Sequence, residues 1–500
     1  MAFFLSLVMI MAMGLTAFAA GETTGTSKSG TTYKLTLTGT ATGHTYEAYQ
    51  IFTGDLSTNA EGKKALSNVE WGTGVTYTET KSAADVAKAL GDGELTIAQL
   101  ENKLTLITPV KTVKSSKDRT VIDGLAAGYY LVKDKDGTQK DTSDAYTTFI
   151  VKVVDNAEVQ VKSDVPTVEK KVQDKNDSTG ETSGWQDSAD ADINDDVQYQ
   201  ITGTVPDNIN DYTSYKYVFT DTMSKGLTYK ANTAKITIGT TDVTKSFTEN
   251  ITDGDNEAKV VTWTCNNLKG IDGVTLDAST KVVVTYSATL NENAVIGAAG
   301  NPNTVNLTYS NNPNKGGDGE TGKTPDDKNI VFTYKTVVNK VEQVTDENGK
   351  PKNQSLEGAA FKLEKKQSDG SYTIVKEYKA GNEVTFTFTG LDDGQYKLTE
   401  TTTPAGYNTI TPIEFTISAE HEKESDYPKL TELSGNATTG EATFAADKVA
   451  GSLTTDVVNK KGSNLPETGG RGTRLLYIGG AILAVTAGTV LVLKKKMRNR

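Results

Sequence analysis

The chain has 500 residues and a formal net charge of −12, which argues against nucleic acid as a partner because phosphate backbones are bound by basic surfaces. A single cysteine, Cys265, excludes an intrachain disulfide, and the two histidines, His44 and His421, stand in different segments. No catalytic triad, paired-histidine metal site or glycine-rich phosphate loop stands out, so we expect no enzyme, no cofactor and no metal ion.

The N-terminus has the layout of a secretory signal peptide. Residues 3–19 are almost wholly apolar, carry no charge and end in Ala17-Phe18-Ala19, a small-x-small pattern. This pattern predicts a signal peptide over residues 1–20, although no lysine or arginine precedes the apolar run.

Residues 21–164 form the first predicted unit, which is mainly β with a small helical insertion. Alternation of apolar and polar residues predicts a strand from Tyr33, and strands return at 128–132 and 148–151. Between them, Ser82 can cap a short helix that runs through Leu90, and 96–104 has helical spacing.

Residues 165–328 form the second predicted unit. Short strand patterns separated by turns are typical of a β-sandwich, and they occur at 197–202, 215–220, 235–238, 260–263 and 281–286. Cys265 continues one of these strands and is expected to be a core residue. The polar run 311–319 predicts a linker or long loop that closes the unit.

Residues 329–461 form the third predicted unit, where Val384, Phe386 and Phe388 alternate with threonines before a turn at 390–394. The predicted architecture is therefore mainly β, with three β-sandwich domains in tandem.

Residues 462–500 contain a short motif, an apolar span and a basic end. The span 475–493 is long enough to cross a hydrocarbon core, and the lysines and arginines after it indicate a cytoplasmic tail. Before the span stand Leu465, Pro466, Glu467, Thr468 and Gly469.

This order resembles the cell-wall sorting signal of Gram-positive surface proteins. The resemblance implies that a sortase cysteine attacks the Thr468 carbonyl, releases the chain from Gly469 onward and passes the acyl group to an amine. The mature protein is then expected outside the cell, covalently attached to the wall.

The third unit contains Val338-Asn339-Lys340-Val341-Glu342, Tyr396-Lys397-Leu398-Thr399-Glu400 and Val457-Val458-Asn459-Lys460. These segments resemble the B-type repeat domain of collagen-binding adhesins, which is also the last domain of sortase-assembled pilins. The resemblance implies an enzyme-free isopeptide bond with Lys340 as amine, Asn459 as amide and Glu400 as acid. Burial suits this chemistry, because it lowers the pKa of a lysine and raises that of a carboxyl group.

The second unit is similar to the middle domain of backbone pilins, with Pro166-Thr167-Val168-Glu169-Lys170 at its start, Phe219-Thr220-Asp221 inside and Asn303-Thr304-Val305-Asn306 near its end. The resemblance implies a bond between Lys170 and Asn303, with Asp221 as the acid. Lys171 and Asn306 remain alternatives, and strand alternation lets only one of the two lysines face the core.

The first unit resembles the N-terminal pilin domain around the segment 44–52, and 128–133 has Lys133 where the third unit has Glu400. We therefore assign no isopeptide bond there. Shaft pilins carry a polymerising lysine at the end of the first domain, often after Tyr-Pro. Lys162 matches that place, but the Tyr-Pro is absent.

Together these resemblances predict the major, or shaft, subunit of a covalent pilus that supports adhesion. Its expected partners are a class C pilin sortase, a housekeeping sortase, identical subunits, minor pilins, peptidoglycan and host surface ligands. The alternative is a monomeric wall-anchored adhesin. A wall-anchored enzyme is disfavoured, since the only predicted chemistry is intramolecular.

Overall fold

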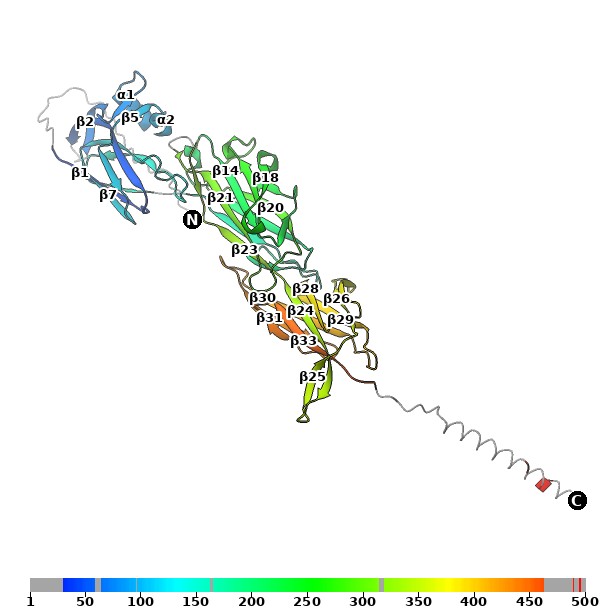
Figure 1. The fold of residues 1–500 in the computed structure, drawn as a ribbon. Helices are drawn as coiled ribbons and strands as arrows, with labels where there is room; N and C mark the ends of the chain where they lie inside the picture. The colour runs from blue at the N-terminus through cyan, green and yellow to red at the C-terminus, as the bar shows by residue number, and fades with distance from the viewer. Residues whose placement is uncertain are drawn as a thin grey trace.

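The structure is a computed structural model that describes residues 30–58, 64–95, 97–161, 165–313 and 319–462, together with 489, 494 and 495. Three units of strands follow one another in an elongated row, first in blue, then in green, then in yellow to orange (Figure 1). The prediction of a mainly β chain of sandwich domains is confirmed.

The first unit packs two sheets, with strand orders β10-β1-β7 and β3-β2-β8-β9, and β6 pairs with β2. Ser82 caps α1 as predicted, since its hydroxyl accepts the Asp85 amide at 3.1 Å. The second helix is shorter than expected, because Leu104 already begins β5. The elements are β1 Tyr33–Thr38, β2 Thr45–Thr58, β3 Lys64–Trp71, β4 Val75–Tyr77, α1 Ala83–Gly91, α2 Ile97–Glu101, β5 Leu104–Leu106, β6 Lys111–Lys114, β7 Arg119–Leu125, β8 Gly128–Asp134, β9 Thr148–Val153 and β10 Ala157–Gln160.

The second unit is a sandwich of two sheets with orders β11-β13-β20-β16-β17 and β12-β23-β21-β14-β19-β18. β15 pairs with β20, and β22 pairs with β21. Aromatic and branched side chains, including Trp263, fill the space between the sheets. The strands are β11 Val168–Val172, β12 Ser188–Asp190, β13 Asp196–Thr204, β14 Tyr217–Met223, β15 Leu227–Tyr229, β16 Lys235–Ile238, β17 Thr241–Asp242, β18 Thr248–Asp253, β19 Lys259–Cys265, β20 Lys281–Leu290, β21 Asn301–Ser310, β22 Thr321–Lys323 and β23 Asp327–Phe332.

The third unit packs the sheet β25-β24-β33-β32 against β27-β26-β29-β30-β31, and β28 pairs with β24. Its first and last strands, β24 and β33, run parallel and adjacent. The strands are β24 Tyr334–Thr345, β25 Pro351–Ser355, β26 Ala360–Lys366, β27 Tyr372–Glu377, β28 Thr385–Leu391, β29 Gly394–Thr402, β30 Ile413–His421, β31 Leu430–Ala437, β32 Ala445–Asp447 and β33 Ser452–Asn459.

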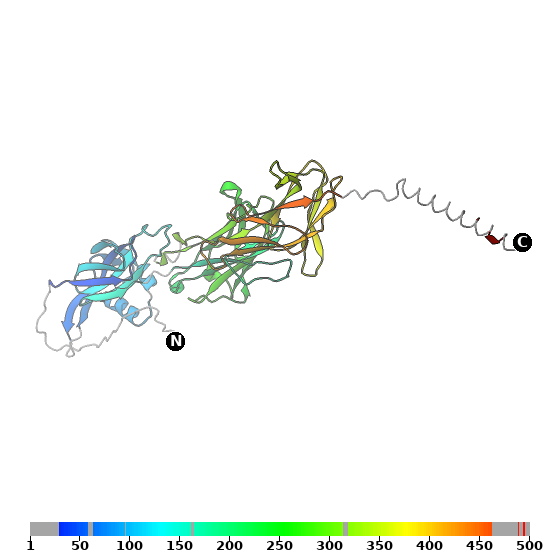
Figure 2. The same cartoon turned by 90° about the horizontal axis from the view of Figure 1, so that it is seen from below.

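The passage from the second to the third unit is very short, and the two units abut in both views (Figure 2). β23 ends at Phe332 and β24 begins at Tyr334, so Thr333 alone separates them. The boundary expected after residue 328 therefore falls inside β23. The polar run 311–319 leads from β21 to β22, which pair with each other, so it connects two strands of one sheet.

Candidate functional site

Lys170 is fully buried in the middle of the second unit. On β11 the side chains alternate between the two faces, so Lys170 and Val172 point into the core and Lys171 points out. Lys171 instead forms ion pairs with Asp187 at 2.8 Å and Glu424 at 3.3 Å. Of the two lysines, only Lys170 lies in the core.

The Lys170 amine reaches two partners across the sandwich, the predicted Asp221 and a tyrosine that was not predicted. Its Nζ donates to Asp221 Oδ1 at 2.5 Å and to the Tyr286 hydroxyl at 2.6 Å. Tyr286 donates to Asp221 Oδ2 at 2.5 Å, and Asn303 Nδ2 donates to the Tyr286 oxygen at 2.9 Å. The structure thus gathers Lys170, Asp221 and Asn303 around one tyrosine hydroxyl, and all four residues are buried.

The surroundings of this cluster are apolar and aromatic. The Lys170 Nζ lies 5.2 Å from the ring centre of Tyr199 and 5.1 Å from that of Tyr286. Burial lowers the pKa of the Lys170 amine, while Asp221 beside it acts in the opposite direction. Burial also raises the pKa of the Tyr286 hydroxyl, which keeps it protonated. A lysine in this setting can lose its proton to a neighbour and become a nucleophile.

Asn303 and Asn306 lie on opposite faces of β21. Asn303 pairs in register with Met223 on β14, which brings its side chain beside Asp221 on the same face. Asn306 points the other way and donates to Asp326 at 3.1 Å. The amide oxygen of Asn303 is buried and accepts no hydrogen bond within the described residues. Asn303 was predicted near the end of the unit. It lies on β21, and two further strands of the same sheet, β22 and β23, follow β21 in the chain.

Tyr286 is a member of the cluster that sequence reasoning missed. It lies on β20, whose alternation of buried and half-buried residues is regular from Val282 to Leu290. Such a pattern places Tyr286 inward, and a buried tyrosine hydroxyl needs a polar partner. An inward tyrosine in a strand between the predicted lysine and asparagine could therefore have indicated its role.

The third unit holds a second lysine–asparagine pair on its adjacent parallel strands β24 and β33. Lys340 and Glu342 pair in register with Val457 and Asn459, so Lys340 and Asn459 lie on the same face, two positions apart. Lys340 is fully buried, and its Nζ donates to the carbonyl oxygens of Val457 at 2.8 Å and Val341 at 3.3 Å. Burial lowers the pKa of Lys340 to about 8, against the opposing influence of Glu400.

Glu400 and Asn459 are in direct contact. Asn459 Nδ2 donates to Glu400 Oε2 at 3.1 Å, and the same oxygen accepts the Ile410 amide at 3.1 Å. The expected acid role has Glu400 facing the amide oxygen, whereas this geometry sets the carboxyl group against the amide nitrogen. Asn459 Oδ1 and Glu400 Oε1 are both buried without hydrogen bonds in the described part of the chain.

The first unit contains a different arrangement at the corresponding strand. Lys133 on β8 lies near two acids, Glu101 at 3.3 Å and Asp136 at 3.1 Å. Lys133 thus has carboxylate partners on both sides, and no isopeptide bond is proposed for this unit.

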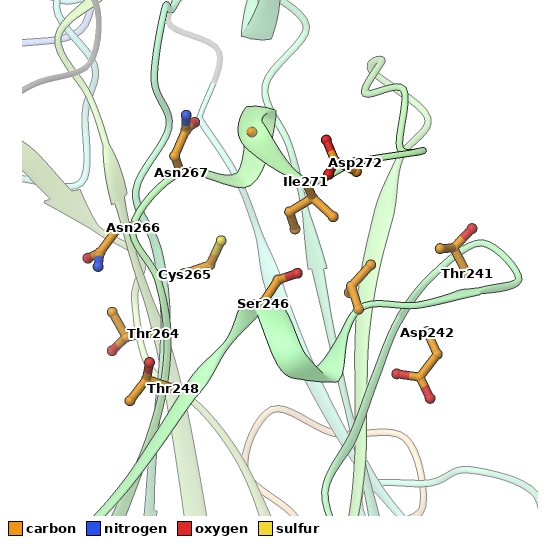
Figure 3. Close-up of a pocket in the computed structure, with 12 residues that line it drawn as sticks. Thr241, Asp242, Ser246, Thr248, Thr264, Cys265, Asn266, Asn267, Ile271 and Asp272 are labelled. Atoms are coloured by element: carbon orange, nitrogen blue, oxygen red, sulfur yellow. The ribbon is translucent and has the colours of Figure 1, made fainter.

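Cys265 lies at the end of β19, beside an open pocket lined mainly by polar side chains of the second unit (Figure 3). The residue is buried, and burial raises the pKa of its thiol. A buried thiol that stays protonated is a poor nucleophile, which agrees with the predicted core position.

The signal peptide (1–20), Lys162 and the sorting motif 465–469 all lie outside the described residues. The same holds for the expected span 475–493. Among the helices that the structure describes, none is long and apolar enough to cross a membrane.

Three family models match the chain. Residues 193–313 match the Gram-positive pilin backbone subunit 2 Cna-B-like domain, residues 338–428 match a prealbumin-like fold domain, and residues 457–499 match the LPXTG cell wall anchor motif. The last of these covers the predicted sorting motif.

The trypsin-resistant surface T6 protein of Streptococcus pyogenes is 26% identical to this chain over 401 residues, which is 67% of this chain and 70% of the relative. Among solved structures, the T6 backbone pilin of S. pyogenes superposes with a TM-score of 0.51 at 17% identity, covering 86% of this chain and 99% of that one. The major pilin SpaD of Corynebacterium diphtheriae gives a TM-score of 0.47 at 19% identity, covering 86% and 98%. The superposition on the T6 backbone pilin indicates a shared fold.

Proposed function

Because the chain belongs to the backbone pilins of Gram-positive bacteria, we propose that it is a shaft subunit whose second and third units are each locked by an internal Lys–Asn bond. The chain is a structural subunit of a sortase-assembled pilus and is attached to the cell wall at the surface. The family is not enzymatic, so the only chemistry proposed within the chain is self-directed.

In the second unit, Lys170 passes a proton to Asp221 and its neutral Nζ attacks Cγ of Asn303. The new C–N bond forms as the bond from Cγ to Nδ2 breaks, and the nitrogen leaves as ammonia. Tyr286 contacts both nitrogen atoms and the acid, so it can carry the proton from one to the other. The observation that carries this proposal is the burial of these four groups, with the Tyr286 hydroxyl hydrogen-bonded to each of the other three.

In the third unit, the same reaction joins Lys340 to Asn459 with Glu400 as the acid. The lowered pKa of Lys340 supports a neutral amine, and the shared face of β24 and β33 brings the amide near it. The contact between Glu400 and the Asn459 amide supports the acid role, provided that the amide turns its oxygen toward the carboxyl group during the reaction.

For polymerisation, a class C sortase cleaves between Thr468 and Gly469 and transfers the Thr468 acyl group to Lys162 of the next subunit. The position of Lys162 supports this: β10 ends at Gln160 and β11 begins at Val168, so the residue lies between two folded units. The span 475–493 would hold the precursor in the membrane until cleavage. A housekeeping sortase then links the pilus base to peptidoglycan, and minor pilins and host surface ligands are its further partners.

Intact-mass measurement of the mature chain tests the two internal bonds. We expect a deficit of two ammonia molecules relative to the sequence. Asp221→Ala should restore the mass of one ammonia, assigned by peptide mapping to the second unit, and Glu400→Ala should restore the other in the third. A wild-type mass equal to that of the plain sequence would contradict both bonds.

A further inference from the structure

The second and third units meet in a joint made largely of polar groups. The segment 173–195, between β11 and β13, lies against the turn that joins β28 to β29. Asn176 donates to Asp393 at 2.6 Å, and the backbone amide of Asp392 donates to Asp192 at 3.0 Å. The two units are therefore connected by side chains as well as by the short passage at Thr333.

Many aspartates lie in this joint, and one group of them contacts a lysine. Lys365 of the third unit forms ion pairs with Asp392, with Asp192 at 2.6 Å and with Asp177 at 3.7 Å. The lysine is almost fully buried. Its ammonium group offsets part of this negative charge, and Lys175 adds a second cation at 3.0 Å from Asp177.

A second group in the joint has no such lysine. Asp174 and Asp190 of the second unit converge with His421 of the third, and each can offer one ligand atom with all three atoms within 4.8 Å of one another. His421 Nε2 lies 3.4 Å from Asp174 Oδ2. Within the described ranges, neither aspartate forms an ion pair with a lysine or arginine.

The hydrogen bonds around His421 indicate which of its ring nitrogens carries the proton and which one presents a lone pair to the carboxylates. Ser188 donates its hydroxyl proton to the carbonyl oxygen of Glu422 at 2.6 Å. The Ser188 oxygen must then accept from His421 Nδ1, which lies 2.7 Å away. Nδ1 thus carries the proton in the neutral ring, and the lone pair of Nε2 points at the acids. The imidazole is 4% exposed, and its Nε2 makes no hydrogen bond in the described part of the chain.

A third polar group lies at this place. The hydroxyl of Tyr334, the first residue of β24, is fully buried, and burial together with the neighbouring Asp190 raises its pKa. The Nε2 lone pair is therefore buried against two carboxylates, an arrangement that a cation between them would stabilise.

We propose that Asp174, Asp190 and His421 bind a divalent transition-metal ion that ties the second unit to the third. Two ligands come from one unit and one from the other, so the ion would bridge the joint. The bond from His421 Nδ1 to Ser188 is the kind of outer contact that fixes the orientation of a metal-binding imidazole.

The ligand types select the class of metal. A mixed set of imidazole and carboxylate suits zinc and its neighbours, whereas calcium and magnesium prefer oxygen ligands alone. Tetrahedral zinc with bonds of about 2.1 Å separates its ligand atoms by roughly 3.4 Å. The distance between His421 and Asp174 agrees with that spacing.

The sequence predicts no metal site, because it contains no paired-histidine motif and the three residues are far apart along the chain. Only the docking of β30 against β12 and the segment before it brings them together.

The test uses the full chain, purified in detergent, stripped with chelator and supplied with zinc alone. We expect the wild-type chain to retain a single zinc ion through gel filtration, measured by mass spectrometry of the metal. His421→Gln should bind zinc at least about tenfold more weakly. The matched control is His44→Gln, because His44 is also buried and hydrogen-bonded to Asp134 at 3.0 Å but belongs to the first unit. The control should bind zinc as the wild type does.

Two further measurements separate a metal site from a merely structural histidine. Ser188→Ala leaves all three ligands in place and should still weaken zinc binding by about tenfold. Cobalt in place of zinc should give the visible absorption of a site with a nitrogen ligand, and His421→Gln should change it. Circular dichroism and the mass deficit of the internal bonds show whether each variant folds. The proposal is wrong if the folded wild type retains no zinc, or if His421→Gln retains as much as His44→Gln.

Discussion

Removal of the Asn303 amide offers a direct measure of what the proposed bond in the second unit contributes to stability. In Asn303→Ala the Lys170 amine has no acyl partner, so the loop from residue 170 to residue 303 stays open in the unfolded chain. By the loop-closure relation used for disulfides, a loop of this length is worth about 5 kcal/mol of unfolding free energy. For a unit of this size, such a loss lowers the melting temperature by roughly 10–20 °C.

The assay is calorimetry combined with intact mass on the same samples. Asn303→Ala should gain the mass of one ammonia, corrected for the substitution, and its second unit should melt at the lower temperature. Asn306→Ala is the matched control, since it removes a neighbouring asparagine whose partner is Asp326 and leaves the cluster intact. If Asn303→Ala keeps the deficit and melts within about two degrees of the wild type, the assignment of Asn303 is wrong. If Asn306→Ala loses the deficit instead, the bond belongs to Asn306.

Three other outcomes are expected from the proposed bonds and from the proposed linkage at Lys162. Because the pKa of Lys340 is lowered to about 8, chain isolated unfolded before the bond has formed should, on folding, form the bond of the third unit slowly at pH 6, where roughly 1% of the amine is neutral, and much faster above pH 8. A rate that mass spectrometry finds independent of pH would contradict this. Under force applied between Lys162 and Thr468, both proposed bonds carry the load past most of their units. Optical tweezers should therefore detect lengthening of at most about 100 Å, which comes from the roughly 30 residues after Asn303. Lengthening by several hundred ångströms would mean that a bond is missing. Lys162→Ala should abolish the high-molecular-weight ladder on boiled SDS gels while monomers still reach the wall. A ladder that persists would move the linkage to another lysine, and a wild type without any ladder would favour the monomeric adhesin.

The force prediction depends on where each bond lies in its sheet. In the third unit, Lys340 and Asn459 lie on the first and last strands, so the load crosses directly from β24 to β33. In the second unit, β22 and β23 follow Asn303 and remain in the path of the load. The side chain of Asp327 on β23 accepts the Lys170 backbone amide at 2.6 Å, which ties this trailing strand to β11.

Strand positions in the second unit were largely predictable, because a half-buried strand alternates polar and apolar residues along the chain itself. The pattern at 281–286 corresponds to β20, and that at 235–238 matches β16. The end of the unit was not predictable in the same way. β22 and β23 have little apolar alternation, and they are strands because they pair with β21 and β12. Pairing with distant partners leaves no local periodicity.

Signal segments, sorting motifs and strand alternation are local patterns, so the wall-anchored character of the protein, its β-sandwich class and the residue types of both proposed bonds were predictable from the sequence. It left Lys170 and Lys171 as alternatives, and likewise Asn303 and Asn306. Which of these side chains share the core became clear from the packing of the sheets, since it depends on which face of one sheet lies against the other. The same packing brought Tyr286 between the lysine and the amide. It also brought His421 to Asp174 and Asp190, across a joint whose two sides are separated by more than two hundred residues of chain.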